Sequence, residues 1–284
     1  MISIEETVAT LEPSAPEGPG RSAASASADS RGARQQPDAS RLLRLDQKAL
    51  RAVQLLPEVA QERRLSDQYR AIKRPILQRF NAMVATAKPG YGAQLLLVTS
   101  ALPGDGKTFT SLNLALSIAR ERDVSVLLID ADVAKPQISR MLGVDGEPGL
   151  LDALANPAVD PEKLVRPTDV PGLSILPVGT EQDSATELLS SARMSAIVGR
   201  MSALDPWRLL IFDSAPLLLS NDSWAIVQIV RQVVLVVRSG ITPQRAVLDA
   251  ISRIDKEKIT GLVLNQNDLR SFNQYYGYGT YGVT

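Results

Sequence analysis

From Gln94 onward the sequence alternates short apolar runs with segments of helical periodicity, and this alternation restricts the fold more than any other feature. The apolar runs are Leu95–Thr99, Val124–Ile129, Leu173–Pro177, Leu209–Phe212, Val233–Val237 and Gly261–Leu264. The helical patterns between them are Thr108–Arg120, Thr186–Met201 and Pro243–Asp255. Nearly continuous apolar strands joined by helices indicate a mostly parallel sheet covered on both faces. The predicted fold class is a doubly wound α/β domain.

The chain before this region has a different character. Residues 12–40 are rich in Pro, Ser, Ala, Gly and Gln, and they cannot bury enough apolar surface to offset the entropy of ordering. The following segment has apolar positions at helical spacing, with a second helix predicted to begin at the N-cap Ser66 and to continue past Pro75. The predicted organisation is a disordered segment 1–40, a helical extension and oligomerisation region 41–90, an α/β domain 91–268 and a flexible tail 269–284.

The residue types that the chain lacks narrow its chemistry. The sequence contains no Cys and no His, which excludes disulfides, thiolate nucleophiles, zinc sites and the Ser-His-Asp triad. Lys and Arg together number 31, as do Asp and Glu, so the charge balance gives no indication of a nucleic-acid partner. No apolar run approaches the roughly 18–20 residues of a membrane helix. Catalysis must therefore use carboxylates, Lys, Arg, hydroxyls, backbone amides or an oxygen-ligated metal.

A phosphate-binding loop is predicted between the first apolar run and the first helix. The segment Ala101–Thr108 matches G-x-x-x-x-G-K-[ST] except that Ala101 replaces the first glycine. Its glycines let backbone N–H groups turn toward phosphate oxygens, and the helix that follows adds its positive end. An ordinary glycine turn is the alternative, but the strand before and the helix after favour a phosphate site. The predicted nucleotide-binding residues are Pro103, Gly104, Asp105, Gly106, Lys107, Thr108 and Phe109.

Two apolar runs end in carboxylates at the sheet edge where open α/β folds bind ligands. Val124–Ile129 leads into Asp130 and Asp132, whose side chains point to the same side of an extended segment. Leu209–Phe212 ends in Asp213, a pattern that delivers one carboxylate to Mg²⁺. A solvated turn or helix cap is the alternative for the first pair. Lys107, Asp130, Asp132 and Asp213 are predicted to be catalytic, and Thr108, Asp130 and Asp213 to bind Mg²⁺.

Three further polar residues have less specific patterns. Asn265 closes the last strand and is predicted to contact the adenine, although a turn residue is an alternative. Asp222 is either another polar contact of the site or an acid at a helix N-terminus. Thr242 followed by Pro243 is predicted to be the N-cap and first residue of a helix.

With these residues in place, the chain resembles the bacterial tyrosine kinases of exopolysaccharide and capsule loci. SALPGDGKT, LLIDADVAKP and LLIFDSAPLLLSND occur in that family's order, and the resemblance covers about residues 41–284. It is strongest to the tyrosine autokinases of exosortase-associated loci, including the YRAIKRP helix. Ala134 stands where most members have Arg. The family's Glu-x-x-Arg-x-x-Arg oligomerisation motif reads Asp67, Arg70 and Lys73, which keeps the charges but loses the bidentate geometry of the last Arg.

The C-terminal segment YYGYGTYG contains four of the six tyrosines, namely Tyr275, Tyr276, Tyr278 and Tyr281. A packed aromatic stripe is one interpretation, but the interleaved glycines disfavour it because they raise the entropy of ordering. The resemblance implies that the four are phosphoacceptors. A phenol has a pKa of about 10, so a carboxylate near the γ-phosphate, Asp130 or Asp132, is expected to accept its proton.

The resemblance also implies a cellular context. It implies an ATP- and Mg²⁺-dependent tyrosine autokinase that acts in trans within a homo-oligomer and regulates the chain length and export of an exopolysaccharide. The expected activator is a membrane-spanning chain-length protein that holds this cytoplasmic chain at the inner membrane, and a tyrosine phosphatase is a further expected partner. Two alternatives are a partitioning-type switch ATPase, whose signature lysine is replaced here by Leu102, and an ATP-binding scaffold without kinase activity.

Overall fold

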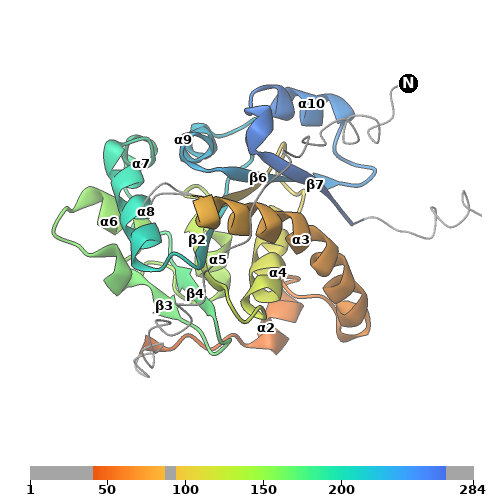
Figure 1. Cartoon of the computed structure of the whole chain (residues 1–284), viewed down its shortest axis with the longest axis horizontal. Coiled ribbons are helices and arrows are strands. Elements are labelled where there is room, and N and C mark those ends of the chain that lie inside the picture. The colour runs from red at the N-terminus through yellow and green to blue at the C-terminus, as the bar shows by residue number, and fades with distance from the viewer. Residues whose placement is uncertain (1–40, 87–93, 267–284) are drawn as a thin grey trace, which may run out of the picture. The chain divides into compact units, whose positions relative to one another are not determined.

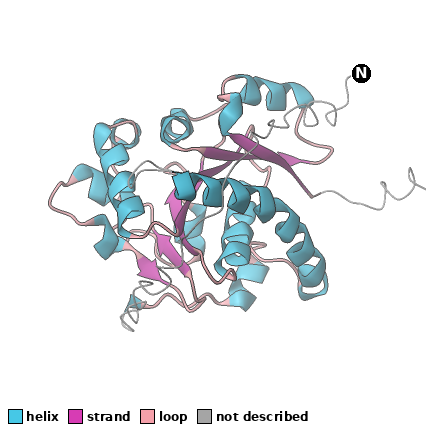
Figure 2. Cartoon of the chain, viewed as in Figure 1, coloured by secondary structure: helices cyan, strands magenta, loops and turns pink. Residues whose placement is uncertain are grey.

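The computed structural model describes residues 41–86 and 94–266, which include a seven-stranded sheet with helices on both faces (Figures 1 and 2). The strands are β1 Leu95–Ser100, β2 Ser125–Ala131, β3 Arg166–Pro167, β4 Leu173–Leu176, β5 Arg208–Ser214, β6 Gln232–Arg238 and β7 Ile259–Asn265. Their order across the sheet is β3-β4-β2-β5-β1-β6-β7. All neighbours are parallel except β3, which runs antiparallel to β4. The predicted doubly wound, mostly parallel sheet is confirmed.

The helices of the described residues surround this sheet. They are α2 Gln47–Ala52, α3 Glu62–Thr86, α4 Lys107–Ala119, α5 Gln137–Met141, α6 Leu150–Ala155, α7 Ala185–Leu189, α8 Ala192–Leu204, α9 Asn221–Ile229 and α10 Gln244–Ser252. Short 3₁₀ turns lie at η2 Val59–Gln61, η3 Pro161–Leu164 and η4 Lys256–Lys258. No helix in the described part of the chain has the length and apolar character needed to cross a membrane.

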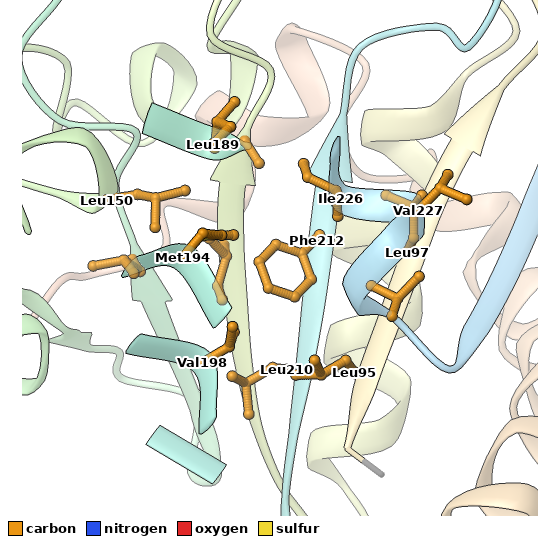
Figure 3. Packing of buried hydrophobic residues seen from close by; sticks show 14 of the residues in the cluster. Leu95, Leu97, Leu150, Leu189, Met194, Val198, Leu210, Phe212, Ile226 and Val227 are labelled. Atoms are coloured by element: carbon orange, nitrogen blue, oxygen red, sulfur yellow. The ribbon is translucent and has the colours of Figure 1, made fainter. Parts of the chain in front are cut away.

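The central strands are apolar on both sides because each contributes to two cores. Leu95 and Leu97 of β1 join a cluster formed with α6 to α10, whereas Leu96 and Val98 join the cluster formed with α3, α4 and α5. Figure 3 shows the first cluster around Phe212, a fully buried side chain of β5. The period-two division follows from the pleat of an extended chain, and it explains why the sequence reads as continuous apolar runs.

The helical extension packs on the face of the sheet that α4 covers. In Figure 1, α3 lies beside α4, and Ile76 and Phe80 of α3 are fully buried in the same core as the apolar face of α4. The predicted start of this helix at Ser66 is wrong, because α3 begins at Glu62 directly after the turn η2 and includes Ser66 in its second turn. As predicted, α3 continues through Pro75, which removes one backbone donor from its interior.

Two other boundaries differ from the sequence prediction. The pattern Thr186–Met201 forms two helices, α7 and α8, separated at Ser190 and Ser191, so one continuous apolar periodicity spans a break in the backbone. Thr242 is not a helix cap: α10 begins at Gln244, and the Thr242 hydroxyl instead donates a hydrogen bond to Asp105. The predicted disordered segment 1–40 and the tail 269–284 lie outside the described residues.

Candidate functional site

The phosphate loop connects β1 to α4 and has the backbone that its glycines predict. Gly104 and Gly106 have φ angles of 83° and 92°, a left-handed conformation that other residues adopt only with strain. Helix α4 begins directly afterwards at Lys107, so its first N–H groups and its positive dipole end lie at the loop. This arrangement is a ready anion site at the carboxyl edge of the sheet.

A cleft of about 1250 Å³ opens above the loop. Its lining includes the predicted binding residues Pro103, Gly104, Gly106, Lys107, Thr108, Phe109 and Asn265, together with Asp132. The lining also includes residues of the helical extension, among them Leu56 in the α2–α3 connection and Arg64 and Gln68 of α3. The extension is therefore part of the cleft itself, a position that sequence patterns did not indicate.

Lys107 and Asp132, which both line the cleft, form an ion pair. The Lys107 Nζ atom lies 2.9 Å from Asp132 Oδ2, and the two side chains are 13% and 4% exposed. Burial alone lowers the pKa of Lys107, but the charges of Asp213, Asp132 and Asp130 outweigh burial and leave this pKa above its ordinary value. Lys107 is therefore a fixed positive charge that Asp132 holds next to the phosphate loop.

Asp213 stands at the end of β5 with one carboxylate oxygen unpartnered. Its Oδ1 accepts a hydrogen bond from the Ser111 hydroxyl at 2.9 Å, whereas Oδ2 is buried without a hydrogen bond of normal geometry. The Thr108 hydroxyl oxygen is likewise buried without a hydrogen bond of normal geometry. This hydroxyl is nevertheless close enough to Asp213 to lower the pKa of that carboxyl. Burial is the largest influence and, despite the opposing charge of Lys107, raises the pKa of Asp213 to about 6.

Asp130 lies opposite Asp213 in the register of β2 and β5 and is fully buried. Its Oδ2 accepts hydrogen bonds from the backbone N–H and the hydroxyl of Ser139, both at 2.8 Å, and its Oδ1 accepts one from the Asp132 N–H at 3.3 Å. Burial and the charge of Asp213 raise the pKa of Asp130 to about 7, while the Ser139 hydrogen bonds act in the opposite direction.

These groups fit a magnesium ion that also binds a phosphate. Thr108 Oγ1 and Asp213 Oδ2 are hard oxygen donors that are buried and unpartnered, and such atoms are costly unless a ligand satisfies them. Three carboxylates face one ammonium group, so an added cation would lower the repulsion. Within the described residues, no group of three or more acidic side chains forms a complete metal site. Mg²⁺ suits an incomplete set because it usually keeps waters and takes substrate phosphates as ligands.

Other predicted residues occupy different positions. Asp105 is buried and does not line the cleft, and the Asn265 amide donates a hydrogen bond to the Asp105 carbonyl. Asp222 lies in the first turn of α9 and accepts a hydrogen bond from the Thr186 hydroxyl, in agreement with the alternative of an N-terminal helix acid. The four predicted phosphoacceptor tyrosines, Tyr275 to Tyr281, lie outside the described residues.

Sequence reasoning missed the two serines that orient the acids. Ser111 lies three residues after Thr108 on α4, so the helical period places both on one face, and this spacing could have indicated it. Ser139 is in α5, nine residues after Asp130, and contacts that carboxylate through both its backbone and its side chain. No local pattern in the sequence predicts this contact.

Comparison with known proteins places the chain in a family. A family model described as ParA, NUBPL iron-transfer P-loop NTPase, matches residues 93–265. The tyrosine-protein kinase YwqD of Bacillus subtilis is 30% identical over 217 residues, which cover 76% of this chain and 86% of that protein. The tyrosine-protein kinase etk of Escherichia coli is 31% identical over 60% of this chain but only 23% of its own length.

Solved structures give the same relationship. The kinase domain of VpsO is 28% identical with a TM-score of 0.59, covering 74% of this chain and all of that domain. The kinase domain of the Escherichia coli tyrosine kinase ETK is 26% identical with a TM-score of 0.56, covering 75% of this chain and 80% of that one. With the phosphate loop and the carboxylates at the ends of β2 and β5, these matches show that the chain belongs to the bacterial tyrosine-protein kinase family of P-loop NTPases.

Proposed function

We propose that this chain is an ATP- and Mg²⁺-dependent protein-tyrosine autokinase that phosphorylates the tyrosines between Tyr275 and Tyr281 of another copy. The observation that carries the proposal is the pair of buried, unpartnered oxygens, Thr108 Oγ1 and Asp213 Oδ2, beside the phosphate loop. Among the described residues, Ser202 Oγ, Arg208 Nε and Gln232 Nε2 are also buried without a partner, so the proposal depends on the position of the two oxygens beside the phosphate loop, where a ligand would complete them. Bound there, Mg²⁺ would supply positive charge to the β- and γ-phosphates.

Lys107 and Asp132 are the pair that responds to the nucleotide. Lys107 is within reach of both the loop and Asp132, so a bound triphosphate competes with Asp132 for the ammonium group. Of the three acids, Asp132 lines the cleft, whereas Asp130 and Asp213 are fully buried behind it. We therefore assign Asp132 as the proton acceptor, with Asp213 and Thr108 as metal ligands and Asp130 as an additional acidic group held by Ser139.

The proposed reaction transfers the γ-phosphoryl group of ATP to a tyrosine. The tyrosine oxygen forms a bond to the γ-phosphorus, the bond from that phosphorus to the β–γ bridging oxygen breaks, and ADP leaves. The phenolic proton passes to Asp132, which accepts it as the attack proceeds. Lys107 stays charged throughout because its pKa is raised, and it neutralises negative charge on the phosphates.

The size of the cleft supports a second occupant beside the nucleotide. Its volume of about 1250 Å³ exceeds the roughly 300–1,000 Å³ of pockets that hold one small ligand. The part of the lining that comes from the helical extension offers Leu56 and the polar side chains of Arg64 and Gln68. We propose that an extended peptide presenting a tyrosine enters this cleft beside the nucleotide.

The cellular part of the proposal follows the relatives. ExoP of Rhizobium meliloti, named a succinoglycan biosynthesis transport protein, is 28% identical over 66% of this chain but only 24% of its own length. We propose that this chain regulates the synthesis, chain length and export of an exopolysaccharide from the cytoplasmic side of the inner membrane. A membrane-spanning chain-length protein would be its activator, a second copy its acceptor, and a tyrosine phosphatase its antagonist.

Two full-length variants test the kinase and its direction together. Lys107→Met keeps the acceptor tyrosines but loses the phosphate-binding lysine, and a second variant has Tyr275, Tyr276, Tyr278 and Tyr281 changed to Phe. Each is incubated with Mg-ATP alone and then mixed with the other, and phosphopeptides are identified by mass spectrometry. We expect phosphate on the Lys107→Met chain only in the mixture, which requires transfer between molecules.

The other outcomes separate the alternatives. Phosphate on wild type but not on the mixed Lys107→Met chain would indicate transfer within one molecule. ATP turnover without tyrosine modification, even with a membrane activator added, would favour a switch ATPase. Nucleotide binding without turnover would favour an ATP-binding scaffold.

A further inference from the structure

One carboxylate of the phosphate loop is turned away from the cleft. Asp105 precedes Gly106 and is only 2% exposed. Its Oδ2 accepts a hydrogen bond from the Leu102 N–H at 3.3 Å, which spans the loop. Its Oδ1 accepts one from the Thr242 hydroxyl at 2.6 Å. A negative charge placed inside a loop that binds phosphates is unfavourable unless it is held in such a fixed, hydrogen-bonded position.

Thr242 connects this carboxylate to the central sheet. It lies in the connection between β6 and α10, and its hydroxyl oxygen accepts a hydrogen bond from the Arg238 N–H at 3.0 Å. Because the oxygen accepts from β6, its single proton is free to be donated to Asp105. A continuous series of hydrogen bonds therefore runs from the end of β6 through Thr242 and Asp105 to the start of the phosphate loop.

Asn265 holds the same part of the loop from β7. The Asn265 side-chain Nδ2 atom donates a hydrogen bond to the Asp105 backbone carbonyl at 2.9 Å. The Asn265 backbone carbonyl accepts one from the Ser239 N–H, also at 2.9 Å. The contact is close, because a Cβ added to Gly106 would lie 1.9 Å from Asn265 Nδ2. Position 106 therefore requires glycine for two reasons: its φ angle is positive, and Asn265 occupies the space that a Cβ would need.

We propose that Asp105, Thr242 and Asn265 are positioning residues that fix the phosphate loop in its nucleotide-binding conformation, an inference that rests on the proposed ATP site. The side chain of Asp105 contacts the protein rather than the ligand, and its charge orders the loop through Leu102 and Thr242. Pre-ordering the loop lowers the entropy lost when the triphosphate binds. Loss of the Thr242 hydroxyl would leave a buried carboxylate with one partner and free to turn toward the phosphates.

The test is the affinity of the full chain for a non-hydrolysable ATP analogue with Mg²⁺, measured by calorimetry at a temperature where every variant is folded. Thr242→Val removes the hydroxyl, and we expect Kd to rise about tenfold or more, the usual effect of losing a hydrogen bond to a charged group. Thr242→Ser restores the hydroxyl and is expected to bind within about threefold of wild type, on the order of 0.6 kcal/mol. Asn265→Ala should weaken binding in the same direction.

Thr260→Val is the matched control. Thr260 lies on β7, and its hydroxyl donates to Gln232 at 3.3 Å, away from the phosphate loop, so its removal should leave Kd unchanged. Equal Kd values for wild type, Thr242→Val and Asn265→Ala would overturn the positioning role while leaving the ATP site intact. A wild-type chain that does not bind the analogue would overturn both the ATP site and this inference. A Thr242→Ser variant as weak as Thr242→Val would show that packing, not the hydroxyl, matters, and would overturn the inference alone.

Discussion

The two halves of helix α4 differ in whether the buried polar groups beside them have hydrogen-bond partners. At its N-terminal end, the Thr108 hydroxyl and one oxygen of Asp213 are buried without partners. Further along, polar side chains at the contact between α4 and the helical extension, here called the seam, have hydrogen-bond partners. There the Asn113 amide donates to the carbonyls of Leu55 and Phe109, each at 2.8 Å, and the Lys73 ammonium group donates to the Ser117 carbonyl at 2.9 Å.

This difference indicates what each half is for. Hydrogen bonds on the seam stabilise the docking of the extension, and Lys73 also places a positive charge near the negative end of the α4 dipole. The unpartnered atoms at the other end cost stability in the ligand-free protein. Selection tolerates such a cost where function requires it, so the same helix combines a stabilising seam with a site that is completed only by its ligands.

Asp213→Asn should have the largest effect, and in opposite directions on activity and stability. Kinase activity is expected to fall on the order of 10²–10³-fold, because a neutral amide is a poor metal ligand. The ligand-free protein at pH 8 should become more stable by about 1–3 kcal/mol, since the raised pKa shows that the site disfavours the ionised carboxylate. Activity assays and urea unfolding in EDTA measure the two quantities. A ligand-free variant less stable than wild type would contradict the comparison.

Asn113→Ala should destabilise the seam without disabling the chemistry. The substitution leaves the Leu55 carbonyl without its donor, which we expect to cost about 1–3 kcal/mol in unfolding free energy. Asn156→Ala is the matched control, because Asn156 is exposed and its side chain accepts a single local hydrogen bond from the Ala158 N–H. Urea unfolding compares the two. If both variants lost the same stability, the seam would not be the stabilising region that the contacts indicate.

The two buried acids of the site should make the stability of the ligand-free protein depend on pH. In the ligand-free protein the pKa values of Asp130 and Asp213 are about 7 and about 6, above their ordinary value of 3.8. Between these limits the folded state binds more protons than the unfolded state, so unfolding free energy falls as pH rises from about 4 through 7. We expect a loss of about 1–3 kcal/mol between pH 5 and 8 in EDTA.

A variant isolates the cause of that pH dependence. Asp213→Asn removes one titrating group and one charge that raises the pKa of Asp130, so its stability should vary less with pH. Urea unfolding at several pH values provides the data. A wild-type stability that rises steadily to pH 8 would show that the buried acids do not dominate this range.

Most of the fold could be predicted because the sheet is buried on both faces. Continuous apolar runs marked the six longer strands, and these formed with small changes at their ends. The two-residue strand β3 was missed because Arg166 and Pro167 have no strand-like pattern, and its pairing depends on β4. The break between α7 and α8 was missed because an apolar face can continue across two helices that pack on the same core.

The site was predictable only where its chemistry is local in sequence. Lys107 and Thr108 belong to a contiguous loop motif, and Asp213 ends an apolar strand, so these patterns were visible. The hydrogen bond from Thr242 to Asp105 joins residues 137 positions apart, and only the folded chain brings them together. For that reason, Thr242 was assigned to a helix cap, the role that its immediate neighbours favour.

The smallest predicted effect concerns two cations on α3. Lys73 is 13% exposed and contacts Ser117 and Glu121 on the seam, whereas Arg70 is 70% exposed and pairs with Asp67 on the same helix. Lys73→Met should cost about 1 kcal/mol, and Arg70→Met at most about 0.5, because exposed pairs are weakened by solvent. Methionine keeps the long stem and helix propensity in both variants. Thermal unfolding at low protein concentration measures the difference, and equal losses would mean that Lys73 contributes nothing to the seam beyond an exposed charge. A loss for Arg70 that grows as the protein concentration is raised would indicate that this residue contacts another copy of the chain, as the resemblance to the oligomerisation motif implies.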